Sequence, residues 1–213
     1  MLKSLQKAFK VKEVRDRLLY TFMMLVVIRI GCCLPIPGVD PSYLHDFFSN
    51  LQSSGMGFFN AITGGSFSSM SIFALSITPY ITSSIIMQVL TIAIPKIEER
   101  QKDGEDVRKK IAEYTRYLTV GLALFESCAM AVGLGGKGLL LEDHRNVWGY
   151  LTVVAAMTAG SALLMWIGER ITDNGVGNGI SIVLLINIVS GTPQDMITLY
   201  ESFMAGKSVA VAT

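Results

Sequence analysis

Charged residues are scarce in this sequence of 213 residues: Asp, Glu, Lys and Arg together make up 16%, whereas soluble proteins average about 25%. Mean hydropathy is high, at +0.47. Hydrophobic residues make up 51% of the chain and are gathered in blocks instead of alternating with polar residues. This composition excludes a disordered or collagen-like chain and argues against an ordinary soluble enzyme.

Cysteine is also rare, and its placement excludes a disulfide-stapled secreted domain. The three cysteines, Cys32, Cys33 and Cys128, are an odd number and lie inside apolar runs without metal-ligand spacing. Catalytic signatures are missing too, because the chain has no HExxH or G-x-S-x-G motif and no paired carboxylates inside an apolar run. We therefore expect no enzyme activity, no metal ion and no other cofactor.

The sequence does contain five long apolar runs. Each approaches, or can be extended to, the ~20 residues that cross a bilayer as a helix. They cover about residues 18–34, 71–94, 115–134, 147–167 and 176–203. Trp148 and Trp166 near the ends of the fourth run would lie about 27 Å apart along a helix, as suits side chains at two membrane interfaces. The sequence predicts an all-α, multispanning membrane protein with five transmembrane helices.

Basic residues are distributed unevenly between the two sides of these predicted helices. Fourteen Lys and Arg residues fall in segments 1–17, 96–116 and 168–179, whereas three fall in the segments that alternate with them. Because positively charged loops remain in the cytoplasm, we expect a cytoplasmic N-terminus. Residues 1–17 are then a cytoplasmic amphipathic segment.

The second basic segment has two interpretations that the sequence leaves open. It can be a topogenic loop beside acidic lipid headgroups, or a docking surface for an acidic partner or for RNA phosphates. The residues that would form such a docking surface are Arg100, Arg108, Lys109 and Lys110.

Residues 55–76 fit neither lipid nor water. They carry no charge and include Gly64-Gly65 and five serines between residues 66 and 76, interleaved with large apolar side chains. Irregular backbone is tolerated at membrane depth only where protein surrounds it. The pattern is compatible with a re-entrant element followed by a polar-lined helix, and hence a pore or transport path. A kinked structural helix is the alternative.

Ordered motifs run along residues 8–193. They include Arg15-Asp16-Arg17, Pro35-Ile36-Pro37-Gly38, Gly64-Gly65, Pro79-Tyr80-Ile81, Tyr114-Thr115-Arg116-Tyr117, Met165-Trp166-Ile167-Gly168-Glu169 and Gly175-Val176-Gly177-Asn178-Gly179-Ile180-Ser181. With these motifs in this order, the chain resembles the SecY family, the channel subunits of bacterial protein translocation. The family has ten membrane helices in two halves of five, related as inverted pseudo-repeats around an hourglass pore.

The resemblance implies that this chain corresponds to the first half of the channel. Residues 18–190 would form a half-channel of five helices, with a short re-entrant plug helix at about residues 57–71. Residues 204–213 would be an external hinge or the start of a sixth helix. The expected location is the bacterial inner membrane.

The resemblance also implies roles for particular side chains. The pore ring, an apolar constriction, would include Ile77, Ile81, Ile180 and Leu184. The plug would include Phe58, Phe59, Asn60, Ile62, Gly64, Gly65, Phe67 and Met70. One side of the lateral gate, through which signal sequences reach lipid, would include Thr82, Ile85, Gln88 and Asn178. Leu184 stands where the family commonly has Ile, a change that keeps size and apolarity.

The implied function is passage of secretory polypeptides across the membrane and of membrane-protein segments into it. The implied partners are SecE and SecG-type small membrane subunits, the C-terminal half of the channel, a ribosome or SecA-type motor ATPase, signal sequences, nascent polypeptides and membrane lipids. A secondary transporter is the rival interpretation, since it too uses broken helices. It would need a charged residue inside a span, and Arg29 and Glu126 are the available ones.

Overall fold

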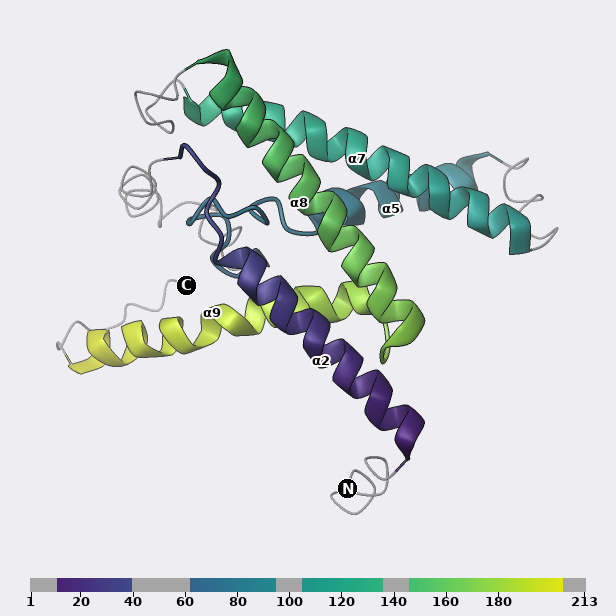
Figure 1. The fold of residues 1–213 in the computed structure, drawn as a ribbon, viewed down its shortest axis with the longest axis horizontal. Helices are drawn as coiled ribbons and strands as arrows, with labels where there is room; N and C mark the ends of the chain where they lie inside the picture. Colours follow the sequence, from purple (N-terminus) through teal and green to yellow (C-terminus); the bar gives the residue numbers. More distant parts are fainter. Residues whose placement is uncertain (1–10, 40–61, 95–104, 136–145, 205–213) are drawn as a thin grey trace.

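The computed structural model describes residues 11–39, 62–94, 105–135 and 146–204. Within these ranges the chain forms five helices joined by turns (Figure 1). They are α2 (Lys12–Cys32), α5 (Thr78–Ala93), α7 (Glu105–Gly135), α8 (Val147–Asn174) and α9 (Gly179–Met204). The predicted all-α fold class is confirmed for the described part of the chain.

Helix α8 is the centre of the arrangement, because it packs against each of the other four helices. It crosses the middle of the molecule and runs opposite to its neighbour α7 (Figure 1). Its buried residues recur every three or four positions and so form one continuous face. That face consists of Val153, Met157, Gly160, Ser161, Leu164, Met165, Ile167, Gly168 and Ile171.

Helix α8 is also the only helix among the described residues that is long and apolar enough to cross a membrane by length and composition. Thr78–Ala93 and Gly179–Thr192 are shorter apolar helices. Trp148 and Trp166 of α8 are 77% and 47% exposed. Five transmembrane helices remain a proposal, which we take up below.

The second apolar run begins differently from the prediction. We expected a helix from residue 71, but α5 starts at Thr78, and residues 72–77 run in turns. Pro79 occupies the first turn of α5, where its missing N–H costs no helical hydrogen bond. Hydropathy could not reveal this boundary, because the turns before it are as apolar as the helix.

Hydroxyl groups join the long helices where their faces meet. The Ser83 and Thr119 hydroxyls of α5 and α7 are hydrogen-bonded at 2.5 Å. Those of Ser127 and Thr158, on α7 and α8, are 3.1 Å apart. Such contacts are a common means of helix association in an apolar solvent, where no hydrophobic driving force operates between helices.

The turn between α8 and α9 is tied to the first helix of the described chain. The Val176 N–H donates to Thr21 Oγ1 at 3.1 Å, and Arg17 Nη1 donates to the Gly175 carbonyl at 3.4 Å. At the same end, Arg116 of α7 forms an ion pair of 2.8 Å with Glu169 of α8. These contacts join α2, α7, α8 and the turn that leads into α9.

Candidate functional site

A buried, irregular segment of residues 62–77 lies at the centre of the molecule, between α2, α8 and α9 (Figure 1). We expected a short plug helix at about residues 57–71, but in the described part of that range the backbone forms consecutive turns after Ile62. Left-handed φ values interrupt any helix: 64° at Gly64, 81° at Gly65, 39° at Met70 and 54° at Ser76. Two of these four positions are glycines, which adopt such values without steric cost. We call residues 62–77 the central segment.

Backbone contacts hold the central segment against residues 34–36, which follow α2. The Ile36 N–H donates to the Met70 carbonyl and the Ile72 N–H donates to the Leu34 carbonyl, both at 3.0 Å. These bonds flank an isolated antiparallel bridge between Pro35 and Ser71. The non-helical backbone is thus satisfied inside protein, the condition under which it is tolerated at membrane depth.

Two glycines let the neighbouring helices approach the central segment closely. A Cβ atom at Gly31 of α2 would collide with the Phe73 ring, and one at Gly160 of α8 would collide with the Ile72 carbonyl oxygen. Phe67 and Met70 are buried in a cluster with Val153 and Met157 of α8. The segment is therefore enclosed by helices on its apolar sides.

Polar contacts connect the central segment to α9 and α8. Asn187 Nδ2 donates to Ser76 Oγ at 3.1 Å, and Ser161 Oγ donates to the Ser76 carbonyl at 3.4 Å. Nearby, Arg29 Nη1 of α2 donates to Ser190 Oγ at 2.8 Å. Arg29, one of the two charges that could serve a transporter inside a span, therefore faces protein and is engaged in a contact between two helices.

The four residues expected in a pore ring meet in one apolar cluster. Ile77 is buried, and Ile81, Ile180 and Leu184 pack against the same buried core. That core also contains Ile28, Cys32, Phe73, Leu164, Ile167, Ile171 and Val183. Ile77, the last residue of the central segment, and residues near the starts of α5 and α9 thus come together beside α8.

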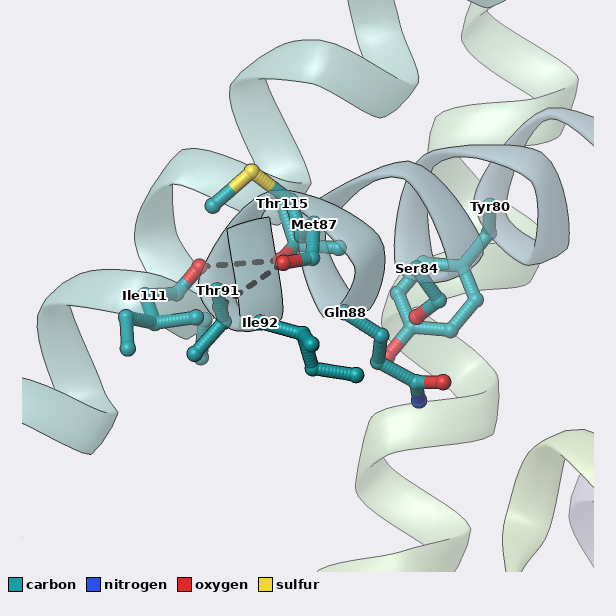
Figure 2. Close-up of a pocket in the computed structure, with 9 residues that line it drawn as sticks. Tyr80, Ser84, Met87, Gln88, Thr91, Ile92, Ile111 and Thr115 are labelled. Carbon is teal, nitrogen blue, oxygen red and sulfur yellow. Dashed lines mark hydrogen bonds between the residues drawn. The ribbon is translucent and has the colours of Figure 1, made fainter. Parts of the chain in front are cut away.

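A hollow of about 450 Å³ lies between α5 and α7 (Figure 2). Its lining is Tyr80, Ser84, Met87, Gln88, Thr91, Ile92, Ile111, Ala112 and Thr115. The hydroxyls of Thr91 and Thr115 donate to carbonyls of their own helices, at 2.7 and 2.9 Å. Apolar carbon therefore dominates one end of the hollow, and the Tyr80 and Gln88 polar groups lie near its other end (Figure 2).

The residues expected at a lateral gate divide into two groups. Gln88 lines the hollow, Ile85 is 55% exposed, and Thr82 donates to the Thr78 carbonyl at 3.1 Å, all on α5. Asn178 is different, because its side-chain oxygen accepts from the Ile180 and Ser181 N–H groups and so caps α9. Its observed interactions are those of a local cap.

The remaining predicted residues are only partly covered by the structure. Phe58, Phe59, Asn60 and Arg100 lie outside the described residues. Arg108 belongs to the first turns of α7, and Lys109 and Lys110, which follow it, are exposed. The basic segment is therefore helical from Glu105 onward.

Sequence reasoning missed the polar residues that bind the central segment. Ser76 belongs to the serine-rich stretch noted in the sequence, but its partners Ser161 and Asn187, and Ser190 beside them, have no predicted role. One signal was available: Asn187 is a lone amide in the apolar run of α9, three residues after Leu184 and so on the same helix face. A polar side chain in such a run demands a partner.

Comparisons with known proteins agree on one family. The sequence model of SecY matches residues 71–213. The protein translocase subunit SecY of Pseudomonas aeruginosa is 42% identical over 194 residues, which are 91% of this chain and 43% of that protein. The Escherichia coli K12 subunit is 43% identical over 198 residues (91% and 44%), and that of Aquifex aeolicus 36% over 211 residues (97% and 49%). The chain spans about half the length of these relatives.

Solved structures support the same fold. Sec61 in the canine ribosome-channel complex from the endoplasmic reticulum and a structure described as a protein conducting channel both superpose with a TM-score of 0.54. Each match covers 84% of this chain and 37% of the other chain, at 20% sequence identity. At 20% identity, this similarity supports only the arrangement of the helices.

Proposed function

This chain belongs to the SecY family, and on that premise we propose that it forms one half of a protein-conducting channel in the bacterial inner membrane. The channel passes secretory polypeptides across the membrane and membrane-protein segments into it. One observation carries the proposal: Ile81 of α5, Ile180 and Leu184 of α9, and Ile77, the last residue of the buried central segment, meet in one apolar cluster.

Aliphatic side chains suit a constriction of this kind. They close around a passing chain without selecting any sequence, and an empty apolar constriction expels water and thereby blocks ions. Ile81, Ile180 and Leu184 are only partly buried here, so they present apolar surface that the described residues do not cover. In the complete channel this surface is the part of the ring that faces the pore.

Residues 62–71 of the central segment are the described part of the plug, which we place at about residues 57–71. Its residues carry no charge and many are small, so that it fills protein-lined space without binding water or lipid strongly. The central segment is joined to its surroundings by two backbone hydrogen bonds to residues 34–36, by side-chain hydrogen bonds at Ser76 and by buried apolar side chains such as Phe67 and Met70. A segment held in this way can be displaced without unfolding a membrane helix.

The hollow between α5 and α7 and the exposed face of α5 form one side of the lateral gate. Ile85, Val89 and Ile92 are 55%, 60% and 77% exposed on α5, and Ser84 and Gln88 lie among them. An apolar surface with a few polar groups suits the helix of a signal sequence, which needs apolar contact and tolerates small hydroxyls. Thr82 belongs to the same face, and Asn178 caps the neighbouring helix.

All five helices cross the membrane in this proposal, with the N-terminus in the cytoplasm. The charged ends of α7 and α8, including the Arg116–Glu169 ion pair, lie at the cytoplasmic surface. Arg170 lies 5.5 Å from the centre of the Trp166 ring, a cation–π contact suited to the headgroup layer. Trp148, at the opposite end of α8, then marks the external surface.

Several partners complete the channel in this proposal. They are small membrane subunits of the SecE and SecG type, the C-terminal half of the channel, and a ribosome or a SecA-type motor ATPase that supplies the energy. Lys109 and Lys110 are exposed at the start of α7, where such a motor or a ribosome would approach. Signal sequences, nascent polypeptides and lipids are the remaining contacts.

Crosslinking to a stalled polypeptide tests the pore assignment. A single cysteine at position 81 should crosslink to a translocating chain that is arrested in the complete channel. A matched cysteine in place of Phe125, which is 71% exposed on α7 away from the cluster, should crosslink to lipid analogues instead. If position 81 captured only lipid analogues, Ile81 would face the bilayer and the proposal would be wrong.

A further inference from the structure

Ser76 is the point where the central segment turns into α5, and two helices hold it there. It has a φ of 54°, which residues with side chains rarely adopt. Its hydroxyl accepts from Asn187 of α9, and its carbonyl accepts from Ser161 of α8. All three residues are at most 2% exposed. The turn into α5 is therefore fixed by buried hydrogen bonds.

Asn187 also contacts the other end of the central segment. A Cβ atom at Gly64 would lie 2.8 Å from the Asn187 carbonyl oxygen and 2.8 Å from Ser190 Oγ, so the Gly64 backbone is seated directly on this turn of α9. Ser190 Oγ in turn donates to the Asn187 carbonyl at 2.7 Å. One residue of α9 thus touches the segment near its beginning and near its end.

The same residue is joined to the proposed pore ring on both sides. Along α9, Asn187 follows Leu184 by three positions, which places the two on one helix face. Across the hydrogen bond, Ser76 directly precedes Ile77. A shift of Asn187 relative to Ser76 therefore changes the spacing between the α5 and α9 members of the ring.

We propose that Asn187 is a positioning residue that latches the central segment in its resting place and so keeps the pore ring closed. The inference rests on the proposed channel function and adds the contact that regulates it. Opening separates Asn187 Nδ2 from Ser76 Oγ and lifts Gly64 from α9.

The chemistry of Asn187 suits a contact that must break. Its side-chain oxygen is buried without a hydrogen-bond partner in the described residues. The amide is therefore only half satisfied in the resting state, and burying a polar atom without a partner disfavours that state. Hydrogen bonds between membrane helices are in any case of modest strength. The contact therefore stabilises the resting position of the central segment but is weak enough to break when the channel opens.

The test measures resting ion conductance of the complete channel, reconstituted with its other subunits in planar bilayers. Asn187→Leu keeps the branched shape of the side chain and removes the donor, and Ser76→Ala removes the acceptor from the other side. Each should raise resting conductance roughly threefold, in line with the modest strength of one interhelical hydrogen bond. The double variant should rise no further than either single variant, because both remove the same bond.

A matched control separates the latch from general damage to α9. The Thr192 hydroxyl is exposed and donates within α9 to the Ile188 carbonyl at 3.4 Å. Thr192→Ala should leave the resting conductance unchanged. If Asn187→Leu and Ser76→Ala also left it unchanged, or if their effects added in the double variant, the proposal would be overturned.

The reactivity of the native cysteines provides a second measurement, which distinguishes loss of the latch from a general loss of folding. Cys32 is 6% exposed and packs in the same cluster as Phe73 of the central segment, whereas Cys128 lies on α7. In a Cys33→Ser background, the latch variants should speed the reaction of Cys32 with a small water-soluble thiol reagent and leave Cys128 unchanged. Equal acceleration at both cysteines means that the whole bundle has loosened, which contradicts the proposal.

Failure of the latch and failure of the channel give different results. If the unmodified channel conducts when it is engaged by a translocating chain but the latch variants show no resting leak, the latch is wrong and the channel stands. If no variant conducts even when engaged, the proposed function itself fails, and the latch fails with it.

Discussion

Ile77 and Ile180 rest on the same residue of α8. A Cβ atom at Gly168 would lie 3.5 Å from Ile77 Cδ1 and 3.3 Å from Ile180 Cγ1. Because Gly168 has no side chain, Ile77 and Ile180 can approach each other beside α8. Gly179, which precedes Ile180, also packs closely against Gly168, because a Cβ atom at Gly179 would collide with the Gly168 carbonyl oxygen.

A bulky residue at position 168 should separate the two halves of the ring formed by α5 and α9. Gly168→Leu should raise the resting ion conductance of the complete channel, because its side chain occupies the space between Ile77 and Ile180. Gly168→Ala should have a small effect, since its Cβ requires shifts of only a few tenths of an ångström. Gly121→Leu is the matched control, because nothing lies within 4 Å of a Cβ atom at Gly121. Equal conductance of the two Leu variants would contradict the assignment.

The four residues that meet in the ring could be predicted from the sequence, but the contacts that hold them together could not. Ile77 and Ile81 are four residues apart, as are Ile180 and Leu184, so helical spacing places each pair on one face, and the SecY resemblance joined the pairs. The structure brings all four into one cluster. Their role in a pore stays a prediction.

The start of α5 was predicted wrongly for a physical reason. Apolar composition reports what a segment is buried in, not its backbone conformation, and residues 72–77 are as apolar as a membrane helix. The left-handed conformation of Ser76 has no signature in its residue type. Its bond to Asn187 joins residues 111 positions apart, a separation to which no helical or strand periodicity applies.

Replacing apolar residues of the ring by polar ones should allow water to enter the constriction. Replacing Ile81 and Leu184 together with Ser should increase ion leak and relax selectivity for signal sequences, because small hydroxyls no longer expel water. Membrane insertion should stay close to normal, since both side chains are only partly buried and a serine there can be hydrated. Single-channel recording and a protease-protection assay of insertion measure the two effects. If the double variant leaked no more ions than the unmodified channel, these residues would not line the constriction.

The orientation of the chain can be checked by labelling from one side. Lys109 should be cytoplasmic and Ser53, which lies outside the described residues, should be external, because the basic residues are concentrated on one side of the predicted helices. Single cysteines at 53 and 109 in a cysteine-free background are treated with a membrane-impermeant reagent on intact cells. Label at position 53 but not at position 109 is expected. The opposite pattern would invert the topology.

The Ser83–Thr119 contact should contribute measurably to the packing of α5 on α7. Both residues are buried, and Thr119 Oγ1 also donates to the Thr115 carbonyl. Ser83→Ala should lower the free energy of unfolding by about 0.6 kcal/mol and by no more than about 1.7, the range found for hydrogen bonds between membrane helices. Unfolding in mixed micelles measures this. Thr152→Ala, an exposed hydroxyl bonded within α8, is the control and should be neutral.

Gly160 should be among the residues of α8 least tolerant of substitution. It faces the Ile72 carbonyl of the central segment, and any Cβ atom there collides with that backbone oxygen. Because the Ile72 N–H is already bonded to Leu34, the segment cannot withdraw without losing its pairing with residues 34–36. Gly160→Ala should therefore destabilise the fold by about 1–3 kcal/mol, the usual cost of overpacking. Gly133→Ala on α7 should not, since a Cβ there meets nothing within 4 Å. Thermal unfolding of both variants in detergent makes the comparison, and a Gly160→Ala variant as stable as the parent would mean that the central segment moves freely against α8.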